Sequence, residues 1–286
     1  MGSDVLATEE LELNRRLGFS QLWVVRERYE IVKGVLVASG PTKRVYAPAV
    51  HSELPGEIAK LRKEDTDALI RFAKTFGELG YDALASPDRR RAGDPLAWVW
   101  AHARQLHRCL ALTWALQDRN DRPIRALLDE IGKEREEVHG AQIRRVVHSF
   151  GPQFKGDERA ATRHILSGLI TKNLARVGLK LTDVAMAAEE SGAGSVASRR
   201  AVPAFRLFLT FDVLIQVAYL HLANALAGGH VQRCASPRCG AFFVQTHLRR
   251  QYCPPFGPKQ ESPCAGRERQ AAFQKRKSRK ESNAQG

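Results

Sequence analysis

Several features are scarce in this 286-residue sequence, and each scarcity excludes a class of protein. With 22 Gly and 13 Pro, the chain has too little of either for a collagen-like or low-complexity protein. Its opening residues, MGSDVLATEELELNRR, lack the basic start and apolar core of a secretory signal, so we expect a cytoplasmic protein. Hydrophobic residues make up 43% and charged residues 27%, which is typical of a globular chain, here long enough for about two domains.

Acidic residues are also scarce. The chain has 31 Asp and Glu against 45 Lys and Arg, for a net charge of +14. Residues 230–286 contain 12 Lys and Arg but only 3 Asp and Glu, so the basic excess is concentrated at the C-terminal end. Such an excess is typical of a protein with a polyanionic partner. We expect nucleic acid rather than a membrane.

Only five cysteines are present, and four of them are clustered: Cys234, Cys239, Cys253 and Cys264. In a reducing compartment, clustered cysteines are more often metal ligands than disulfides. Four thiolates satisfy tetrahedral Zn²⁺, and the close first pair fits a zinc knuckle. The ten residues between Cys253 and Cys264 exceed the usual spacing and require a proline-rich excursion.

These observations predict a zinc centre with four cysteine ligands. Another metal, redox sensing and unrelated structural thiols stay open as alternatives. His230 and His247 are spare candidate ligands that could replace a cysteine.

The residues around the last cysteine predict a helix. Ser262 and Pro263 form a typical cap and first-turn pair, which places Cys264 in the first turn of a helix running to about Lys280. A knuckle, a short hairpin around Phe242 and Phe243, and a last ligand entering a helix indicate a treble-clef-like zinc finger.

Basic residues follow along this helix and precede it in the hairpin. A helix held rigidly by metal at its N-terminus can lie along a groove and neutralise phosphates. A solvated basic tail without a fixed partner is the alternative. We expect Phe273 to pack against the finger rather than to stack on a base. The predicted nucleic-acid-binding residues are Arg249, Arg250, Arg267, Arg269, Lys275, Arg276, Lys277, Arg279 and Lys280.

The preceding part of the chain has mainly helical periodicity, apart from two candidate strands within 22–50. We expect a turn at Ser39-Gly40-Pro41 between these strands, in a hairpin or three-stranded sheet. Helices are expected from Glu57 to Gly80, from an Asp94-Pro95 cap, over 122–139 and over 158–177. The apolar run 207–227 indicates a central core helix that ends at Gly228-Gly229.

The predicted fold is therefore mainly α with a small β element, in the α+β class. Its divisions are a flexible N-terminus over 1–20, an α-rich domain over 21–229 and the zinc finger over 230–286. We expect the α-rich domain to sense a small-molecule effector or to form a homodimer.

No catalytic site stands out. His102 and Cys109 are seven residues apart and share one helix face, where a nucleophilic pair is conceivable. The residues between them are typical of an amphipathic core, as are Trp98, Trp100 and Trp114. We therefore expect no enzymatic activity.

The C-terminal residues resemble one known family. The segment from Cys234 to Cys239, followed by Gly240 and Phe243, is similar to the first knuckle of the CGNR-type zinc-finger proteins. Tyr252-Cys253 stands at that family's aromatic-Cys position, and Cys264-Ala-Gly-Arg267 stands where Cys-Gly-Asn-Arg would be. These proteins pair a helical region, often called ABATE, with a C-terminal finger in bacterial transcription regulation. The resemblance covers residues 215–280 and implies zinc and DNA binding.

Together these observations predict a zinc-dependent DNA-binding protein that regulates transcription. RNA binding is one alternative, because charge alone does not distinguish A-form from B-form nucleic acid. A protein-interaction scaffold, in which zinc only folds the C-terminal residues, is the other.

Overall fold

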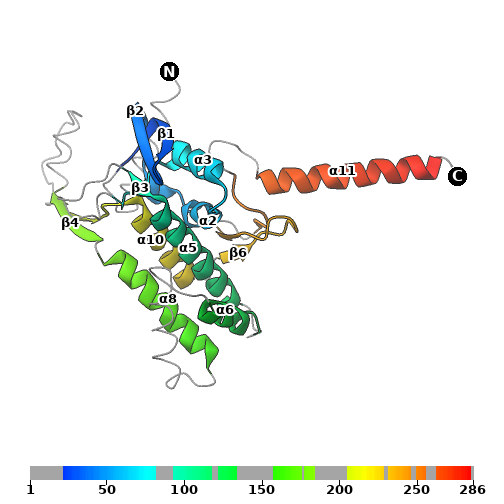
Figure 1. The fold of residues 1–286 in the computed structure, drawn as a ribbon. Helices are drawn as coiled ribbons and strands as arrows, with labels where there is room; N and C mark the ends of the chain where they lie inside the picture. Colours follow the sequence, from blue (N-terminus) through cyan, green and yellow to red (C-terminus); the bar gives the residue numbers. More distant parts are fainter. Residues whose placement is uncertain are drawn as a thin grey trace, which may run out of the picture. The chain divides into compact units, whose positions relative to one another are not determined.

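The computed structural model has a mixed α and β fold in which helices predominate (Figure 1). It describes residues 22–81, 93–117, 122–133, 157–175, 177–183, 205–228, 231–245, 249–255 and 262–284.

Within these residues, the strands pair in three small antiparallel sheets, ordered β1-β2-β3, β4-β5 and β6-β7. The strands are β1 (Trp23–Val32), β2 (Val35–Tyr46), β3 (Asp94–Pro95), β4 (Gly178–Asp183), β5 (Phe205–Thr210), β6 (Val231–Arg233) and β7 (Phe242–Val244). The helices are the 3-10 turn η1 (Pro48–Val50) and α2 (Leu54–Ala59), α3 (Thr66–Phe76), α5 (Leu96–Gln117), α6 (Arg122–Lys133), α8 (Glu158–Leu174), α10 (Leu214–Gly228) and α11 (Pro263–Ala284).

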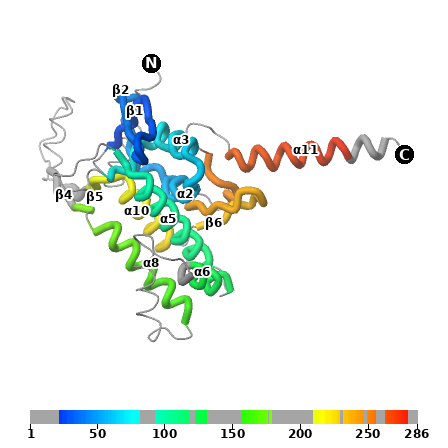
Figure 2. Tube along the Cα trace, in the orientation of Figure 1, coloured from blue at the N-terminus to red at the C-terminus, as the bar shows by residue number. Residues whose placement is uncertain are grey.

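Two compact units divide the chain, and each draws on segments far apart in the sequence. Unit 1 takes its described residues from Met1–His51, Ile70–Leu96 and Lys172–Ala218. Unit 2 takes its described residues from Ser52–Leu69, Ala97–Thr171 and Tyr219–Gly286. The colours of Figure 2 show this in unit 2, where α2, α5 and the orange segment that contains β6 come from separate parts of the chain.

The β1-β2 hairpin turns at a different place from the one expected. Val32 pairs with Val35, so the turn is Lys33-Gly34, and both residues have positive φ, as a type I′ turn requires. The expected turn at Ser39-Gly40-Pro41 was wrong because these residues lie inside β2. Gly40 and Pro41 stand opposite the single residue Glu27, so this part of the motif forms a β-bulge.

Of the two expected forms, a hairpin or a three-stranded sheet, the structure has the sheet, and its third strand is formed by the predicted helix cap, Asp94-Pro95. Leu36 pairs with Asp94 in β3, and α5 begins only at Leu96. The buried Asp94 carboxylate accepts hydrogen bonds from the backbone N–H groups of Leu79, Gly80 (3.0 Å) and Tyr81 (2.7 Å). The prediction that Asp94 caps the following helix was therefore wrong. Its carboxylate instead accepts hydrogen bonds from the backbone N–H groups of the segment that follows α3.

The helix expected from Glu57 to Gly80 is broken into two. The Asp65 carboxylate accepts a 2.8 Å bond from the Ala68 N–H and so caps α3 as a separate helix. This helix ends at Phe76, because Gly77 adopts a φ of +86°. The apolar periodicity stops between the two helices, because residues 62–67 are all polar, and this gap is the sign of the break in the sequence.

The apolar run 207–227 is likewise not one helix. Phe205–Thr210 is β5, which pairs with β4, and α10 begins at Leu214. The Gln216 side chain accepts bonds from the N–H groups of Asp212 (2.9 Å) and Val213 (3.4 Å), as in a capping box. Pairing with a distant strand therefore overrides the apolar pattern in the first four residues of the run, 207–210.

In unit 2, the interior is built around α5. The Tyr219 hydroxyl lies 3.2 Å from His102 Nδ1, and both side chains are buried. The predictions of helices over 122–139 and 158–177 are confirmed for the described residues in α6 and α8, which an Arg125–Glu158 ion pair joins at 2.7 Å. Among the described helices, none has both the length and the apolarity to cross a membrane.

Replacing Asp94 by Asn tests the buried carboxylate of unit 1. The amide keeps the shape but removes the charge that receives three backbone N–H groups, so we expect Asp94→Asn to lower the free energy of unfolding by about 2–3 kcal/mol. Urea denaturation followed by circular dichroism measures this. The matched control is Asp129→Asn on the exposed face of α6, and an equal effect of the two substitutions would contradict the role given to Asp94.

Candidate metal centre

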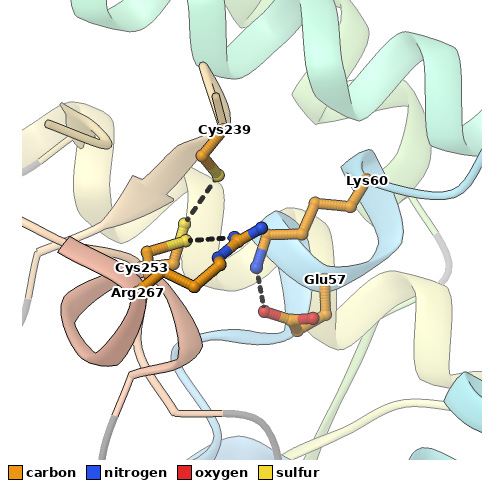
Figure 3. Close-up of polar contacts among 6 residues, drawn as sticks. Glu57, Lys60, Cys239, Cys253 and Arg267 are labelled. Atoms are coloured by element: carbon orange, nitrogen blue, oxygen red, sulfur yellow. Dashed lines mark hydrogen bonds and ion pairs between the residues drawn. The ribbon is translucent and has the colours of Figure 1, made fainter. Parts of the chain in front are cut away.

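Four cysteine sulfurs converge in unit 2. The Sγ atoms of Cys234, Cys239, Cys253 and Cys264 all lie within 4.8 Å of one another, so the predicted cluster is confirmed. Cys239 Sγ and Cys253 Sγ are 3.5 Å apart, too far for a disulfide bond of about 2.05 Å (Figure 3). A tetrahedral ion with metal–sulfur bonds of about 2.3 Å places its sulfurs about 3.8 Å apart. The cluster could therefore hold one metal ion.

The first two cysteines stand on a short turn between paired strands. β6 pairs with β7 through Val231–Val244 and Arg233–Phe242, and the Cys234 N–H donates to the Ala241 carbonyl at 2.8 Å. The Cys239 N–H bonds the Ser236 carbonyl at 3.0 Å. The next residue, Gly240, has a φ of +59°, which returns the chain to β7. This is the knuckle predicted from the spacing.

Cys264 enters the cluster from the first turn of α11, as the sequence predicted. Ser262 precedes the helix, its side chain accepts a 3.4 Å bond from the Ala265 N–H, and Pro263 is the first helical residue. The Arg267 guanidinium, one turn later, donates to Cys264 Sγ at 3.3 Å. The Ser236 hydroxyl donates to the Glu268 carboxylate at 2.8 Å, which joins the knuckle to α11.

Segments far away in the sequence cover the cluster. Phe243 is fully buried and packs with three of the cysteines. A Cβ added to Gly56 in α2 would lie 3.1 Å from the Phe242 carbonyl, so α2 approaches β7 closely. The Phe242 ring contacts His107 and Trp114 of α5 at centroid distances of 5.7 Å each. The C-terminal module is therefore built onto α2 and α5 within unit 2.

A partly buried ion pair lies beside the cysteines. Lys60 Nζ contacts the Glu57 carboxylate, and the carboxylate is buried (Figure 3). Burial opposes the charge of Lys60, but the charges of Glu57 and of the cysteines Cys253 and Cys239 outweigh it and raise its pKa. Lys60 therefore stays protonated and supplies positive charge to the cluster.

The thiols differ in how readily they lose a proton. Burial raises the pKa of Cys253, and the neighbouring Cys239 raises it further against the opposing Lys60 charge. Burial also raises the pKa of Cys264, although the Arg267 hydrogen bond opposes this. Burial opposes ionisation of Cys239, but the Ala241 N–H and the neighbouring thiols bond its sulfur and lower its pKa. Of these three sulfurs, Cys239 is therefore the one that loses its proton most readily before metal binds.

The predicted nucleic-acid-binding residues fall into three groups. Arg267 is bound to the cluster through Cys264, and Arg249 and Arg250 lie just before Cys253. On α11, Arg269, Lys275, Arg276 and Lys277 have exposed side chains. Arg279 and Lys280 lie in the same helix, but their side chains are outside the described set.

Phe273 does not pack against the module. Its side chain is 67% exposed, so the expectation that it would pack there was wrong. The reason is its position on α11. Phe273 is nine residues beyond Cys264, which places it on the opposite side of the helix from the residues that contact the knuckle.

Other residues considered from the sequence lie elsewhere. The spare ligands His230 and His247 fall outside the described residues. Cys109 is completely buried in α5, which raises its pKa to about 12. Its thiol therefore stays protonated at neutral pH, and His102 bonds Tyr219.

Sequence reasoning missed Glu57, Lys60, Ser236 and Glu268. The first two precede the cluster by more than 170 residues, and only their packing places them beside it. Ser236 and Glu268 carried a weak local signal, because they stand two and four residues beyond the ligands Cys234 and Cys264.

Comparisons of the chain with protein-family models, with curated proteins and with solved structures found no match. We therefore infer function from the geometry and the charge of the site.

The cysteine cluster predicts the metal content of the purified protein. We expect one metal ion per chain, and we expect Cys234→Ser/Cys264→Ser to lose it because two of four sulfurs are gone. Elemental analysis of protein purified without chelator measures this. Cys109→Ala is the matched control and should keep the metal, and a metal-free wild-type chain would contradict the assignment.

Lys60 predicts how tightly the ion is held. Replacing Lys60 by Gln removes a positive charge beside the thiolates, so we expect metal affinity to fall by about tenfold, a typical effect of residues that support ligands. Competition with a chromophoric chelator measures the affinity. Lys60→Arg should retain most of it, and the exposed Lys63→Gln serves as the control. Equal affinity in all four proteins would show that Lys60 has no such role.

Proposed function

We propose that this protein is a zinc-dependent DNA-binding protein that acts in transcription regulation. The observation that carries the proposal is a long, exposed, basic helix, α11, whose first turn contains one of four clustered cysteines. Its mechanism is binding without bond chemistry.

The first turns of α11 are attached to the cysteine module. The Arg267 guanidinium bonds Cys264 Sγ, and the Glu268 carboxylate bonds Ser236 of the knuckle. Cys264 and Glu268 are one turn apart on the same face of α11. A metal ion bound by Cys264 together with Cys234 and Cys239 would also link α11 to the knuckle. The helix would then present its outer face in one direction, which lowers the entropy lost on binding.

The opposite face of α11 combines basic residues with an aromatic ring. Arg269, Phe273 and Arg276 follow at steps of four and three residues, so they form one stripe along the helix. Every residue from Ala271 to Ser278 is exposed. Arginines placed this way would neutralise phosphates and could read guanine edges, while Phe273 is available to contact a base or a thymine methyl group.

The shape of this surface favours B-form DNA over double-stranded RNA. A helix of 22 residues is about 33 Å long, and the major groove of B-DNA is wide enough to admit an α-helix. The major groove of A-form RNA is too deep and narrow for side chains to read.

Zinc is the metal that we propose for the cluster. Four thiolates around one Zn²⁺ carry a net charge of −2, and the positive charges of Lys60 and Arg267 would offset it. A finger of the treble-clef type is consistent with the knuckle and with the last ligand in a helix. The resemblance to CGNR-type zinc-finger proteins supports the same proposal. Within it, the α-rich part of the chain has a sensing or dimerisation role.

Neutralising the stripe tests the DNA interface. For Arg269→Gln/Arg276→Gln we expect weaker binding to duplex DNA and a salt dependence reduced by about 0.9 for each lost phosphate contact. Fluorescence anisotropy at several salt concentrations measures both quantities on the full, metal-loaded chain. The matched control, Lys74→Gln/Arg163→Gln, removes two exposed charges from α3 and α8 and should bind like wild type.

The same assay separates the alternatives. Unchanged DNA affinity in the stripe variant would contradict the proposal and favour a scaffold whose metal is structural. Duplex RNA of the same length, added as competitor at fixed salt, should displace DNA poorly. Equal competition would instead favour RNA binding.

A further inference from the structure

A second cationic site lies within unit 2. A cavity of about 350 Å³ is lined by Arg62, Lys63 and Glu64 of the α2–α3 connection and by Trp100, Arg104 and His107 of α5. Residues 62–64 are in this position because the chain breaks after α2, where a continuous helix had been expected. The three α5 residues follow at steps of four and three, so they share one helix face.

The charges around this cavity are mostly positive. The lining contains three basic side chains, Arg62, Lys63 and Arg104, and one acidic side chain, Glu64. Burial, together with the positive charges of Arg62 and Arg108, lowers the pKa of His107. The cavity therefore favours an anion with more than one negative charge.

Two backbone carbonyls of neighbouring residues hold the Arg62 side chain in place. Its Nη1 donates to the carbonyls of Ala59 (3.0 Å) and Leu61 (3.4 Å). A guanidinium carries five N–H donors, and these two bonds both use one nitrogen. The remaining nitrogens form the planar edge that suits a phosphate group.

The size and the lining indicate more than an inorganic anion. A volume of about 350 Å³ lies in the range of small-molecule sites, which is roughly 300–1,000 Å³. Trp100 supplies an apolar wall, although its side chain is only 7% exposed. We infer that this cavity binds a small phosphate monoester, whose dianionic group contacts Arg62 and Arg104 and whose organic part lies against Trp100.

The site adjoins the C-terminal module. The His107 ring lines the cavity and contacts Phe242 of β7 at a centroid distance of 5.7 Å. β7 begins three residues after Cys239 and pairs with β6, the strand that leads into Cys234. A ligand that contacts the His107 ring would therefore be linked to the cysteine module through one contact, that of His107 with Phe242.

Phenyl phosphate is a suitable probe, because it joins a phosphate dianion to a flat apolar ring. We expect saturable binding to the full, DNA-free chain by isothermal titration calorimetry at fixed ionic strength, with benzoate binding more weakly. Arg62→Gln and Arg104→Gln should each reduce the affinity by about tenfold, the loss expected for one charge-assisted contact. On phenyl phosphate addition, the ring resonances of His107 should shift in the NMR spectrum.

Arg163→Gln is the matched control, since it removes one exposed arginine from α8 in the same unit. Circular dichroism checks that each variant is folded. Absence of saturable binding, or equal loss in the control, would overturn the inference. Displacement of phenyl phosphate by duplex DNA in wild type would also overturn it, because the cavity would then contact backbone phosphates. The calorimetry uses no DNA, so its outcome is independent of the proposed function.

Discussion

Convergence of four thiols is the constraint on which the C-terminal part of this protein depends. Three of the sulfurs belong to buried residues, and all four lie within 4.8 Å of one another, close enough to share one metal ion. Without a metal, burial raises the pKa of Cys253 and Cys264, so these two buried sulfurs favour the neutral thiol form. Because the strands there have three residues each, few backbone bonds hold the module together. Metal binding would therefore be coupled to folding of this region.

The cysteine module is not independent of the rest of unit 2. Lys60 contributes charge, Gly56 allows α2 to approach β7, and the Phe242 ring contacts α5. These contacts connect three features of the structure: the cysteine cluster, helix α11 and the cationic cavity. A change at one of them can reach the others through side chains in direct contact, without a long pathway.

The N-terminal elements show where pattern reading succeeds and where it fails. Helices with strong periodicity and clear ends, such as α5 and α8, are close to their expected positions. The errors occur where a distant partner decides the local structure. Asp94 was expected to cap a helix but bonds the chain after α3, and residues 205–210 pair with β4 instead of continuing into α10. Neither partner is visible in the local sequence.

Local sequence determined most of the candidate metal site. The spacing of the cysteines, Gly240 after the knuckle and the Ser262-Pro263 helix start are short-range features whose geometry depends on nearby backbone alone. Tertiary structure alone decided what surrounds them. It placed Lys60 beside the sulfurs, left Phe273 exposed within the basic stripe and brought Arg62 together with Arg104 around one cavity. The physical reason is range: turns and caps depend on bonds within a few residues, whereas burial and electrostatic fields depend on packing between segments distant in the sequence.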